Sequence, residues 1–248
     1  MRIAYDIIGS REKAIALLGV NVKDPEKAAE EIMKRHKNVK SVLQKLAERK
    51  GTFRLYPCKL IKGEDNTEVI HKEYGYLIKV DPRKAYFSPR EATERQRIAS
   101  MVKPGENILV MFAGVGPFSI AISKKEPTCK IVNVEINENA VSYAEENIKL
   151  NNLKNVKNVC CDVRNMKEGK FDRIIMPLVE KAIEYLDVAF SHSKKGSIIH
   201  LYGLSDNLEE RVKNIAQKMG VNYRIIKKQK VLPYAPRIWK IRLDIEII

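Results

Sequence analysis

The stretch that most constrains the fold runs from residue 108 to residue 137 and joins two apolar segments through a glycine turn. Residues 108–112, ILVMF, form a continuous apolar run, which is typical of a strand covered on both faces of a sheet. Gly114 and Gly116 follow at once and let the chain turn sharply against a ligand. Residues 119–123 then predict a helix and residues 132–136 a second strand. We interpret this stretch as a nucleoside-binding βαβ unit.

The nature of the ligand is predicted from the turn and from Glu135. Glu135 follows the glycines by about twenty residues, near where a doubly wound sheet places an acid against ribose hydroxyls. Pro117 and Phe118 come directly after the GVG turn, which lacks the third glycine of a dinucleotide fold and leaves little room for a pyrophosphate. A nucleoside without phosphates fits, and S-adenosyl-L-methionine is such a ligand. The alternative is a glycine turn that only connects a strand to a helix.

The rest of the chain continues the alternation of strands and helices. Strands are predicted at 156–161, 171–176, 197–202, 223–231 and 239–248, and helices at 140–150, 182–191 and 207–219. Repeated β-α-β units imply an α/β fold with a doubly wound, mostly parallel sheet. The strand ends at Glu135, Asp162 and Met176 are then expected along one crevice, where such sheets bind their ligands.

The residues before position 83 have a different pattern. A helix is predicted after Asp24, which is followed by a proline suited to the first helical turn. Strands are predicted at 53–56, 68–71 and 76–80. We interpret residues 1–82 as a small α+β domain and residues 83–248 as the larger domain, with an arginine-rich helix at the start of the second.

The charge of the chain indicates its partner. Lysines and arginines number 46 against 31 aspartates and glutamates, so the net charge is +15. Such an excess favours nucleic acid as the partner; the alternative is a generally basic, solvated surface. The opening residues do not resemble a signal peptide, no apolar run has the length of a membrane span, and the cysteines lack zinc spacing. We expect a cytoplasmic monomer without membrane contacts or a metal.

Residues 232–237 separate the last two predicted strands and contain two prolines, Tyr234 and Arg237. An aromatic ring and an arginine in such a loop can stack on a base or contact a nucleic-acid backbone. A stiff hairpin connection without a binding role is the equally supported alternative.

Four segments resemble one known family. They are FSPREATER at 87–95, MFAGVGPFSI at 111–120, ENIKLNNL at 146–153 and YAPRIW at 234–239. Together they resemble the archaeal and eukaryotic tRNA (guanine37-N1)-methyltransferase family. The resemblance implies a class I methyltransferase domain behind a small RNA-binding domain, with S-adenosyl-L-methionine as donor and the anticodon loop of tRNA as partner. Members often carry a further N-terminal domain that binds the tRNA elbow, which this chain is expected to lack.

The resemblance also implies roles for single residues. Glu94 matches the general base that removes the proton of guanine N1, and Arg54 matches the arginine that stabilises charge on the guanine oxygen. The residues matched to the donor site are Tyr86, Arg95, Phe112, Gly114, Glu135, Ile136, Asp162, Val163 and Pro177. The residues expected to bind RNA are Arg90, Tyr234 and Arg237.

Two positions depart from the family pattern. Val110 replaces an acid expected near the amino-acid end of the donor, and Pro177 lies where an Asn-Leu-Pro run is expected. Pro177 has neither a side-chain amide nor a backbone N–H, so one polar contact must come from elsewhere. Three functions remain: methylation of guanosine 37, a wybutosine-pathway reaction on the same nucleotide by methyl or aminocarboxypropyl transfer, or tRNA binding without turnover.

Overall fold

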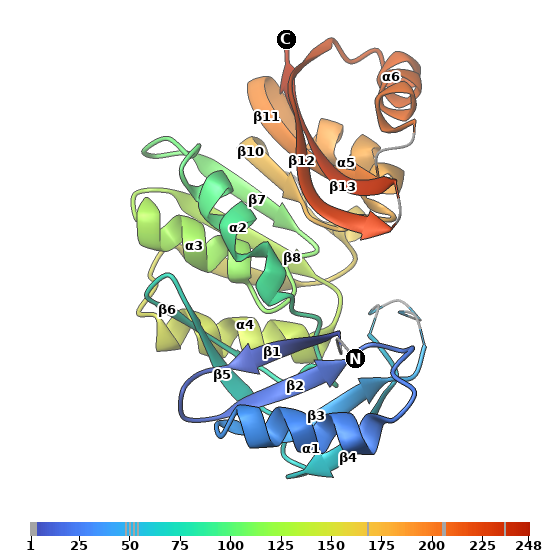
Figure 1. Ribbon diagram of the computed structural model, residues 1–248. Helices are drawn as coiled ribbons and strands as arrows, with labels where there is room; N and C mark the ends of the chain where they lie inside the picture. The colour runs from blue at the N-terminus through green and yellow to red at the C-terminus, as the bar shows by residue number, and fades with distance from the viewer. Residues whose placement is uncertain are drawn as a thin grey trace.

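The computed structural model describes residues 4–47, 49, 51, 53, 55–167, 169–204, 207–235 and 237–248. A four-stranded sheet and one helix form the N-terminal part, and a seven-stranded sheet with helices on both faces forms most of the rest (Figure 1). A two-stranded hairpin lies between them. None of the described helices is long and apolar enough to cross a membrane.

The N-terminal sheet is built from β1 (Tyr5–Gly9), β2 (Ala14–Leu18), β3 (Val39–Lys45) and β4 (Cys58–Gly63), in that spatial order. Helix α1 (Pro25–Arg35) covers one face of it (Figure 1). The helix begins as predicted, because the Asp24 side chain accepts a hydrogen bond from the Lys27 N–H and Pro25 occupies the first turn.

Strand β2 contributes to two cores, because successive side chains of a strand point to opposite faces. Ile15 and Leu17 belong to a large buried cluster that also contains side chains of β7 (Asn107–Met111) and α3 (Pro117–Lys125). The residues between and beside them pack against α1. The N-terminal part therefore shares a core with the large sheet, and the predicted division of the chain after residue 82 stays a prediction.

The strand predicted at 53–56 is wrong in position. Phe53 lies in a turn, and the strand begins at Cys58. The regular ladder ends where β3 ends, at Lys45, which pairs with Cys58. Beyond it the Leu46 N–H still donates to the Pro57 carbonyl at 2.7 Å and Leu55 forms an isolated bridge, but no continuous strand forms. The strands predicted at 68–71 and 76–80 are present as β5 (Val69–Glu73) and β6 (Tyr76–Val80), which form the hairpin.

The large sheet confirms the predicted α/β class. Its strands are β7, β8 (Lys130–Glu135), β9 (Val156–Cys160), β10 (Phe171–Met176), β11 (Ser193–Leu204), β12 (Tyr223–Ala235) and β13 (Ile238–Ile247). The spatial order is β12-β13-β11-β10-β7-β8-β9. The five strands from β11 to β9 pair in parallel, and β13 joins β11 antiparallel. The order reverses between β7 and β10, where doubly wound sheets bind their ligands.

Helices cover both faces of this sheet (Figure 1). One buried cluster contains side chains of α2 (Ala92–Ala99), α3 and α4 (Glu138–Leu150), and the opposite cluster contains side chains of η3 (Ala182–Tyr185), α5 (Leu186–Ser191) and α6 (Leu208–Met219). Strand β7 explains the arrangement, since Ile108 and Val110 belong to the first cluster and Leu109 and Met111 to the second. The continuous apolar run is a strand buried on both sides, as predicted.

Strand β12 is longer than predicted, and β13 begins one residue earlier than predicted. Leu232 pairs with Lys240 and Pro233 with Trp239, so the ladder continues through most of the segment predicted as a loop. The prolines remain compatible with this geometry because β12 lies at the edge of the sheet.

The β5–β6 hairpin is fastened to α4 by two buried asparagines. The Asn147 side chain accepts from the Lys79 N–H at 2.6 Å and donates to the Lys79 carbonyl at 3.1 Å. Asn151 makes the same two contacts with Leu77, at 3.0 and 2.7 Å. These residues belong to the ENIKLNNL segment, so in this structure the segment joins the hairpin to the large sheet.

Candidate functional site

The glycine turn after β7 is held to the end of β8 by one carboxylate. Gly114 and Gly116 have φ values of 56° and 80°, in the left-handed region that favours glycine. The Gly114 N–H donates to Glu135 Oε2 at 2.8 Å. Glu135 Oε1 accepts from the Ile136 and Asn137 N–H groups, each at 2.9 Å. The turn and the predicted ribose acid therefore form one rigid unit at the carboxyl edge of the sheet.

A cavity of about 560 Å³ lies at this edge, and we call it the donor cavity. All nine residues predicted for the donor site line it: Tyr86, Arg95, Phe112, Gly114, Glu135, Ile136, Asp162, Val163 and Pro177. The parallel strands place their carboxyl ends together, which explains why residues far apart in sequence meet here. The walls combine apolar side chains with three acids, Glu91, Glu135 and Asp162, a composition that fits a nucleoside. Their contact with a donor stays a prediction.

Arg95 is 1% exposed, and Glu73 of the hairpin holds it in place. Arg95 Nε and Nη2 donate to the two Glu73 oxygens at 2.7 and 2.5 Å. Burial by itself raises the pKa of Glu73, but hydrogen bonds from His71 and Arg95 outweigh it and lower that pKa to about 2. The pair links β5 to the wall of the donor cavity.

A second hollow of about 420 Å³ adjoins the donor cavity, and we call it the outer hollow. The two share Arg49, Tyr86, Phe87, Ser88, Glu91 and Val179 among the described residues. Basic and aromatic side chains line the outer hollow: Lys45, Arg49, Arg90, Lys240, Tyr56, Tyr86 and Tyr234. The Arg49 guanidinium lies 5.4 Å from the Tyr56 ring centre and 4.8 Å from that of Tyr86. Such a surface suits stacked bases and phosphates.

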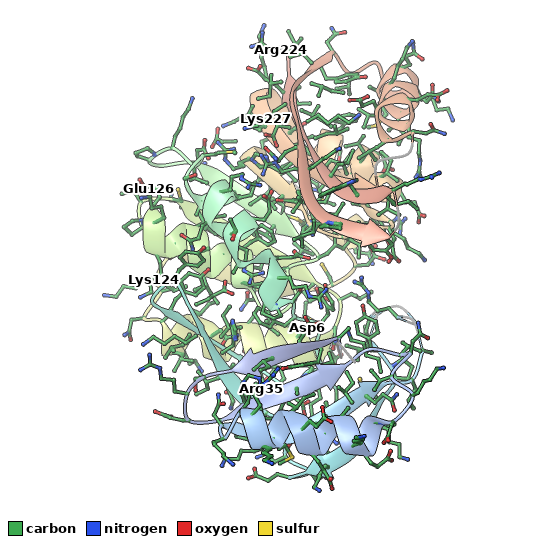
Figure 2. All side chains as sticks on the ribbon, in the orientation of Figure 1. Asp6, Arg35, Lys124, Glu126, Arg224 and Lys227 are labelled. Carbon is green, nitrogen blue, oxygen red and sulfur yellow. The ribbon has the colours of Figure 1, made fainter. Side chains whose placement is uncertain are left out.

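Of the three residues predicted to bind RNA, two line the outer hollow and the third does not. Arg90 lines the outer hollow and pairs with Asp6 of β1 at 2.5 Å; Figure 2 shows Asp6 at the side of the N-terminal sheet nearest α2. Tyr234 lines the same hollow and donates a hydrogen bond to Glu180 at 2.6 Å. Arg237 is exposed in the turn between β12 and β13 and lines neither hollow. Contact with RNA stays a prediction for all three.

Glu94, the predicted base, lies outside both hollows. Its side chain is 3% exposed. Oε1 accepts from the Tyr202 hydroxyl at 2.8 Å and from Arg242, and Oε2 accepts from Arg97 at 2.5 Å. Both carboxylate oxygens are therefore engaged inside the protein. The predicted role of Glu94 as base stays a prediction, and the role of Arg54 falls on a residue outside those described.

The contacts of Glu94 continue through a buried charged chain. Arg242 Nε donates to Asp244 Oδ1 at 2.6 Å, and the same oxygen lies 2.6 Å from His200 Nδ1. Arg173 lies 2.7 Å from His200 Nε2 and can only donate, so this nitrogen accepts and Nδ1 carries the proton. Burial lowers the pKa of His200 and keeps the ring neutral. This chain fixes α2 against β11 and β13.

The two positions that depart from the family pattern, Val110 and Pro177, have different surroundings in the structure. Val110 is fully buried among apolar side chains and does not line the donor cavity, so an acid is not missing from the wall there. Pro177 does line it. Sequence reasoning missed Arg49, Glu91 and Lys240, which line the hollows. Glu91 lies within FSPREATER, three residues before Glu94, which was the only signal available.

Comparisons with known proteins point to one family. The family model for the TRM5/TYW2 methyltransferase domain matches residues 69–226. The chain is 40% identical over 253 residues to tRNA (guanine(37)-N(1))-methyltransferase Trm5b of Pyrococcus abyssi, covering 98% of this chain and 74% of that protein. It is 35% identical over 221 residues to tRNA(Phe) (4-demethylwyosine(37)-C(7)) aminocarboxypropyltransferase of Methanocaldococcus jannaschii, covering 86% of this chain and 88% of that protein.

A solved structure agrees with these matches. The complex of aTrm5 and tRNALeu superposes with a TM-score of 0.87 at 34% identity, covering 100% of this chain and 73% of that chain. The resemblance therefore extends over both the N-terminal part and the large sheet.

Proposed function

Because the chain belongs to the TRM5/TYW2 methyltransferase family, we propose that it methylates N1 of guanosine 37 in tRNA, next to the anticodon, with S-adenosyl-L-methionine as donor. The observation that carries this proposal is the donor cavity, in which the glycine turn, Glu135 and Asp162 meet beside the basic and aromatic outer hollow. The name of the Pyrococcus abyssi relative supports the same reaction.

The residues of the donor cavity fit a nucleoside. Glu135 and Asp162 supply hydrogen-bond acceptors for ribose hydroxyls and an adenine amino group, and Phe112, Val163 and Pro177 supply apolar walls for a ring. When bound, the sulfonium donor supplies an electrophilic methyl group, so the protein has to orient the base and remove a proton. Neutral guanine N1 is a poor nucleophile, and an acid must therefore accept its proton. Glu94 is the candidate by resemblance, and Glu91 is the candidate by position.

A nucleoside digest tests the proposal. The protein is incubated with S-adenosyl-L-methionine and an unmodified tRNA that carries guanosine 37, and the RNA is then digested to nucleosides. We expect N1-methylguanosine, and none from the same tRNA with adenosine at position 37. Because Glu135 holds the glycine turn, Glu135→Ala should reduce the yield at limiting donor by about tenfold or more. Absence of N1-methylguanosine with the wild-type protein would refute the proposal.

One observation favours a second candidate, aminocarboxypropyl transfer to the tricyclic base. Pro177 lines the donor cavity where the family resemblance leads us to expect an asparagine, and the chain covers 88% of the Methanocaldococcus jannaschii aminocarboxypropyltransferase. A tRNA that carries the tricyclic base serves as the second substrate. If the digest of this tRNA showed a mass gain equal to the aminocarboxypropyl group, aminocarboxypropyl transfer would take the place of methyl transfer as the proposed reaction. If calorimetry showed donor binding and neither product formed, the protein would be a tRNA-binding protein without turnover.

We also propose that the protein acts as a cytoplasmic monomer. Sedimentation of the protein alone and with tRNA tests this, and a stable dimer in both samples would contradict it.

A further inference from the structure

Arg95 is a buried cation at the wall of the donor cavity, and some of its N–H groups are unused. A guanidinium carries five N–H groups in one plane. Contacts with the described residues use three of them: Nε and Nη2 donate to Glu73, and Nη1 donates to the Ser88 carbonyl at 3.1 Å. These contacts leave one N–H on Nη1 and one on Nη2 for an acceptor in the cavity that Arg95 lines. A buried arginine in this state suits an anionic group of a ligand.

The order of the strands indicates which end of the donor lies near Arg95. Asp162 follows β9, Glu135 ends β8 and the glycine turn follows β7, so the polar groups of the cavity succeed one another across the sheet. Arg95 belongs to α2, whose Glu94 binds β11 and β13 on the other side of β7. With adenine at Asp162 and ribose at Glu135, the amino-acid end points toward Arg95. That end carries the carboxylate of S-adenosyl-L-methionine.

Glu73 holds the guanidinium of Arg95 in one orientation. Its two oxygens accept from Nε and Nη2 side by side, and such a paired contact fixes both the position and the plane of the guanidinium. The Tyr76 hydroxyl donates to Glu73 Oε1 at 2.7 Å, and the Gln96 side chain donates to that hydroxyl at 3.2 Å. The unused N–H groups of Arg95 therefore have a set direction before a ligand arrives.

His71 connects Glu73 to the N-terminal sheet. The Gly9 N–H of β1 donates to His71 Nδ1 at 3.2 Å, so this nitrogen accepts and Nε2 carries the proton. His71 Nε2 lies 3.5 Å from Glu73 Oε2. The His71 ring packs on Phe87, with 5.1 Å between ring centres, and the Phe87 ring centre lies 5.2 Å from the guanidinium carbon of Arg95. Contacts therefore run without a break from β1 through β5, which lies beside it, to the donor cavity (Figure 1).

We propose that Glu73 and His71 are positioning residues for the donor, and that they aim the two unused N–H groups of Arg95 at the carboxylate of its amino-acid end. The inference rests on the proposed function, because it takes S-adenosyl-L-methionine as the ligand of the donor cavity. Methyl transfer changes no bond of this carboxylate, and the product S-adenosylhomocysteine keeps it. Glu73 and His71 should therefore strengthen the binding of donor and product alike and leave the rate of the bound complex unchanged.

Calorimetry with two adenosine ligands tests the inference. S-adenosylhomocysteine carries the amino-acid end, and methylthioadenosine lacks it. We expect the wild type to bind S-adenosylhomocysteine more tightly than methylthioadenosine by about tenfold or more. Glu73→Gln should lose about tenfold in affinity for S-adenosylhomocysteine and less than about twofold for methylthioadenosine, because glutamine offers the guanidinium one acceptor in place of two. A change that only loosened the fold would lower both affinities alike.

His71→Phe provides a second, milder variant. It keeps the pair of Glu73 and Arg95 and a ring beside Phe87, and it removes both contacts of the imidazole nitrogens. We expect a loss of about threefold for S-adenosylhomocysteine and none for methylthioadenosine. This variant carries the test if Glu73→Gln does not fold. Equal losses for the two ligands in either variant, or an unchanged affinity for S-adenosylhomocysteine in both, would overturn the inference.

The matched control is Glu31→Gln, which changes an exposed glutamate of α1 in the same way. It should bind both ligands as the wild type does. A loss for S-adenosylhomocysteine alone in this control, equal to that of Glu73→Gln, would also overturn the inference, because the effect would not depend on the contact with Arg95.

Single-turnover kinetics with tRNA separate this inference from the proposed function. For Glu73→Gln, the donor concentration that gives half of the maximal rate should rise by about the factor lost in binding, and the rate at saturating donor should change by less than about twofold. A fall in that rate at an unchanged half-maximal concentration would overturn the inference alone. If the wild type forms no N1-methylguanosine while the difference between the two ligands holds, the proposed function fails alone.

Discussion

Glu73 and Asp244 are buried carboxylates whose charge the fold stabilises. Both are less than one-tenth exposed, and each accepts hydrogen bonds from an arginine. For Asp244, burial raises the pKa, but contacts from His200 and Arg242 lower it from 3.8 to about 2. The pKa of Glu73 is lowered from 4.5 to about 2 by its own hydrogen-bonding partners. Each carboxylate therefore links its protonation to the stability of the folded chain.

The stability of the protein should consequently fall in acid. A carboxyl group with a lowered pKa in the folded state stabilises the fold above its unfolded pKa and loses that contribution as the pH falls toward the folded value. For Glu73 the window runs from 4.5 down to about 2, and the contribution at neutral pH is roughly 3 kcal/mol. Urea unfolding at a series of pH values measures this. Glu73→Gln should unfold more easily at neutral pH and show a weaker pH dependence. An unchanged free energy of unfolding across the window would contradict the assignment.

At the scale of secondary-structure elements, the β5–β6 hairpin depends on α4. The side chains of Asn147 and Asn151 take the place of a neighbouring strand, because they satisfy the N–H and carbonyl groups of Leu77 and Lys79. Glu73 lies at the end of β5, so the hairpin also holds Arg95 at the donor cavity. The helix thus supports the site without lining it.

Asn147→Ala should destabilise the protein by about 2–4 kcal/mol, because it leaves buried backbone groups of Lys79 and Val115 without partners. Urea unfolding gives the free energy, and hydrogen exchange should show loss of protection at the Lys79 amide. Lys149→Ala, an exposed change on the same helix, should alter stability by less than about 0.5 kcal/mol. Equal effects of the two substitutions would contradict the structural role of Asn147.

At the scale of the whole molecule, the N-terminal part and the large sheet share a core. Ile15 and Leu43 of the N-terminal sheet belong to the same buried cluster as Val110 and Ile120. Two parts joined in this way are expected to unfold together, since separating them exposes apolar surface on both.

Two probes should therefore report a single transition in urea. Far-UV circular dichroism follows the whole chain, and the fluorescence of the single tryptophan, Trp239, follows β13 of the large sheet. We expect coincident midpoints, and a shift of both by the same amount in Ile15→Ala, which should lose about 2–5 kcal/mol. An earlier loss of dichroism than of fluorescence would show that the N-terminal part unfolds by itself.

The sequence by itself determined the α/β class and the succession of strands and helices in the large sheet, and together with the family resemblance it identified nine of the residues that line the donor cavity. Local periodicity identifies strands and helices, and parallel strands bring their carboxyl ends to one edge, so Gly114, Glu135 and Asp162 had to meet. Where pairing depends on a neighbour's length, as at 53–56 and 232–237, local pattern misplaced the boundaries.

Only the tertiary structure decided which acid near α2 lines the cavity. Glu91 and Glu94 lie three residues apart, and nothing local distinguishes them. Their partners, Lys240 and Arg242, come from β13 at the far end of the chain. These two residues share one face of that strand, because alternate side chains point the same way. Glu94 points into the protein because Arg242, about 150 residues further along the chain, donates a hydrogen bond to it. Glu91 instead lies at the wall of both hollows.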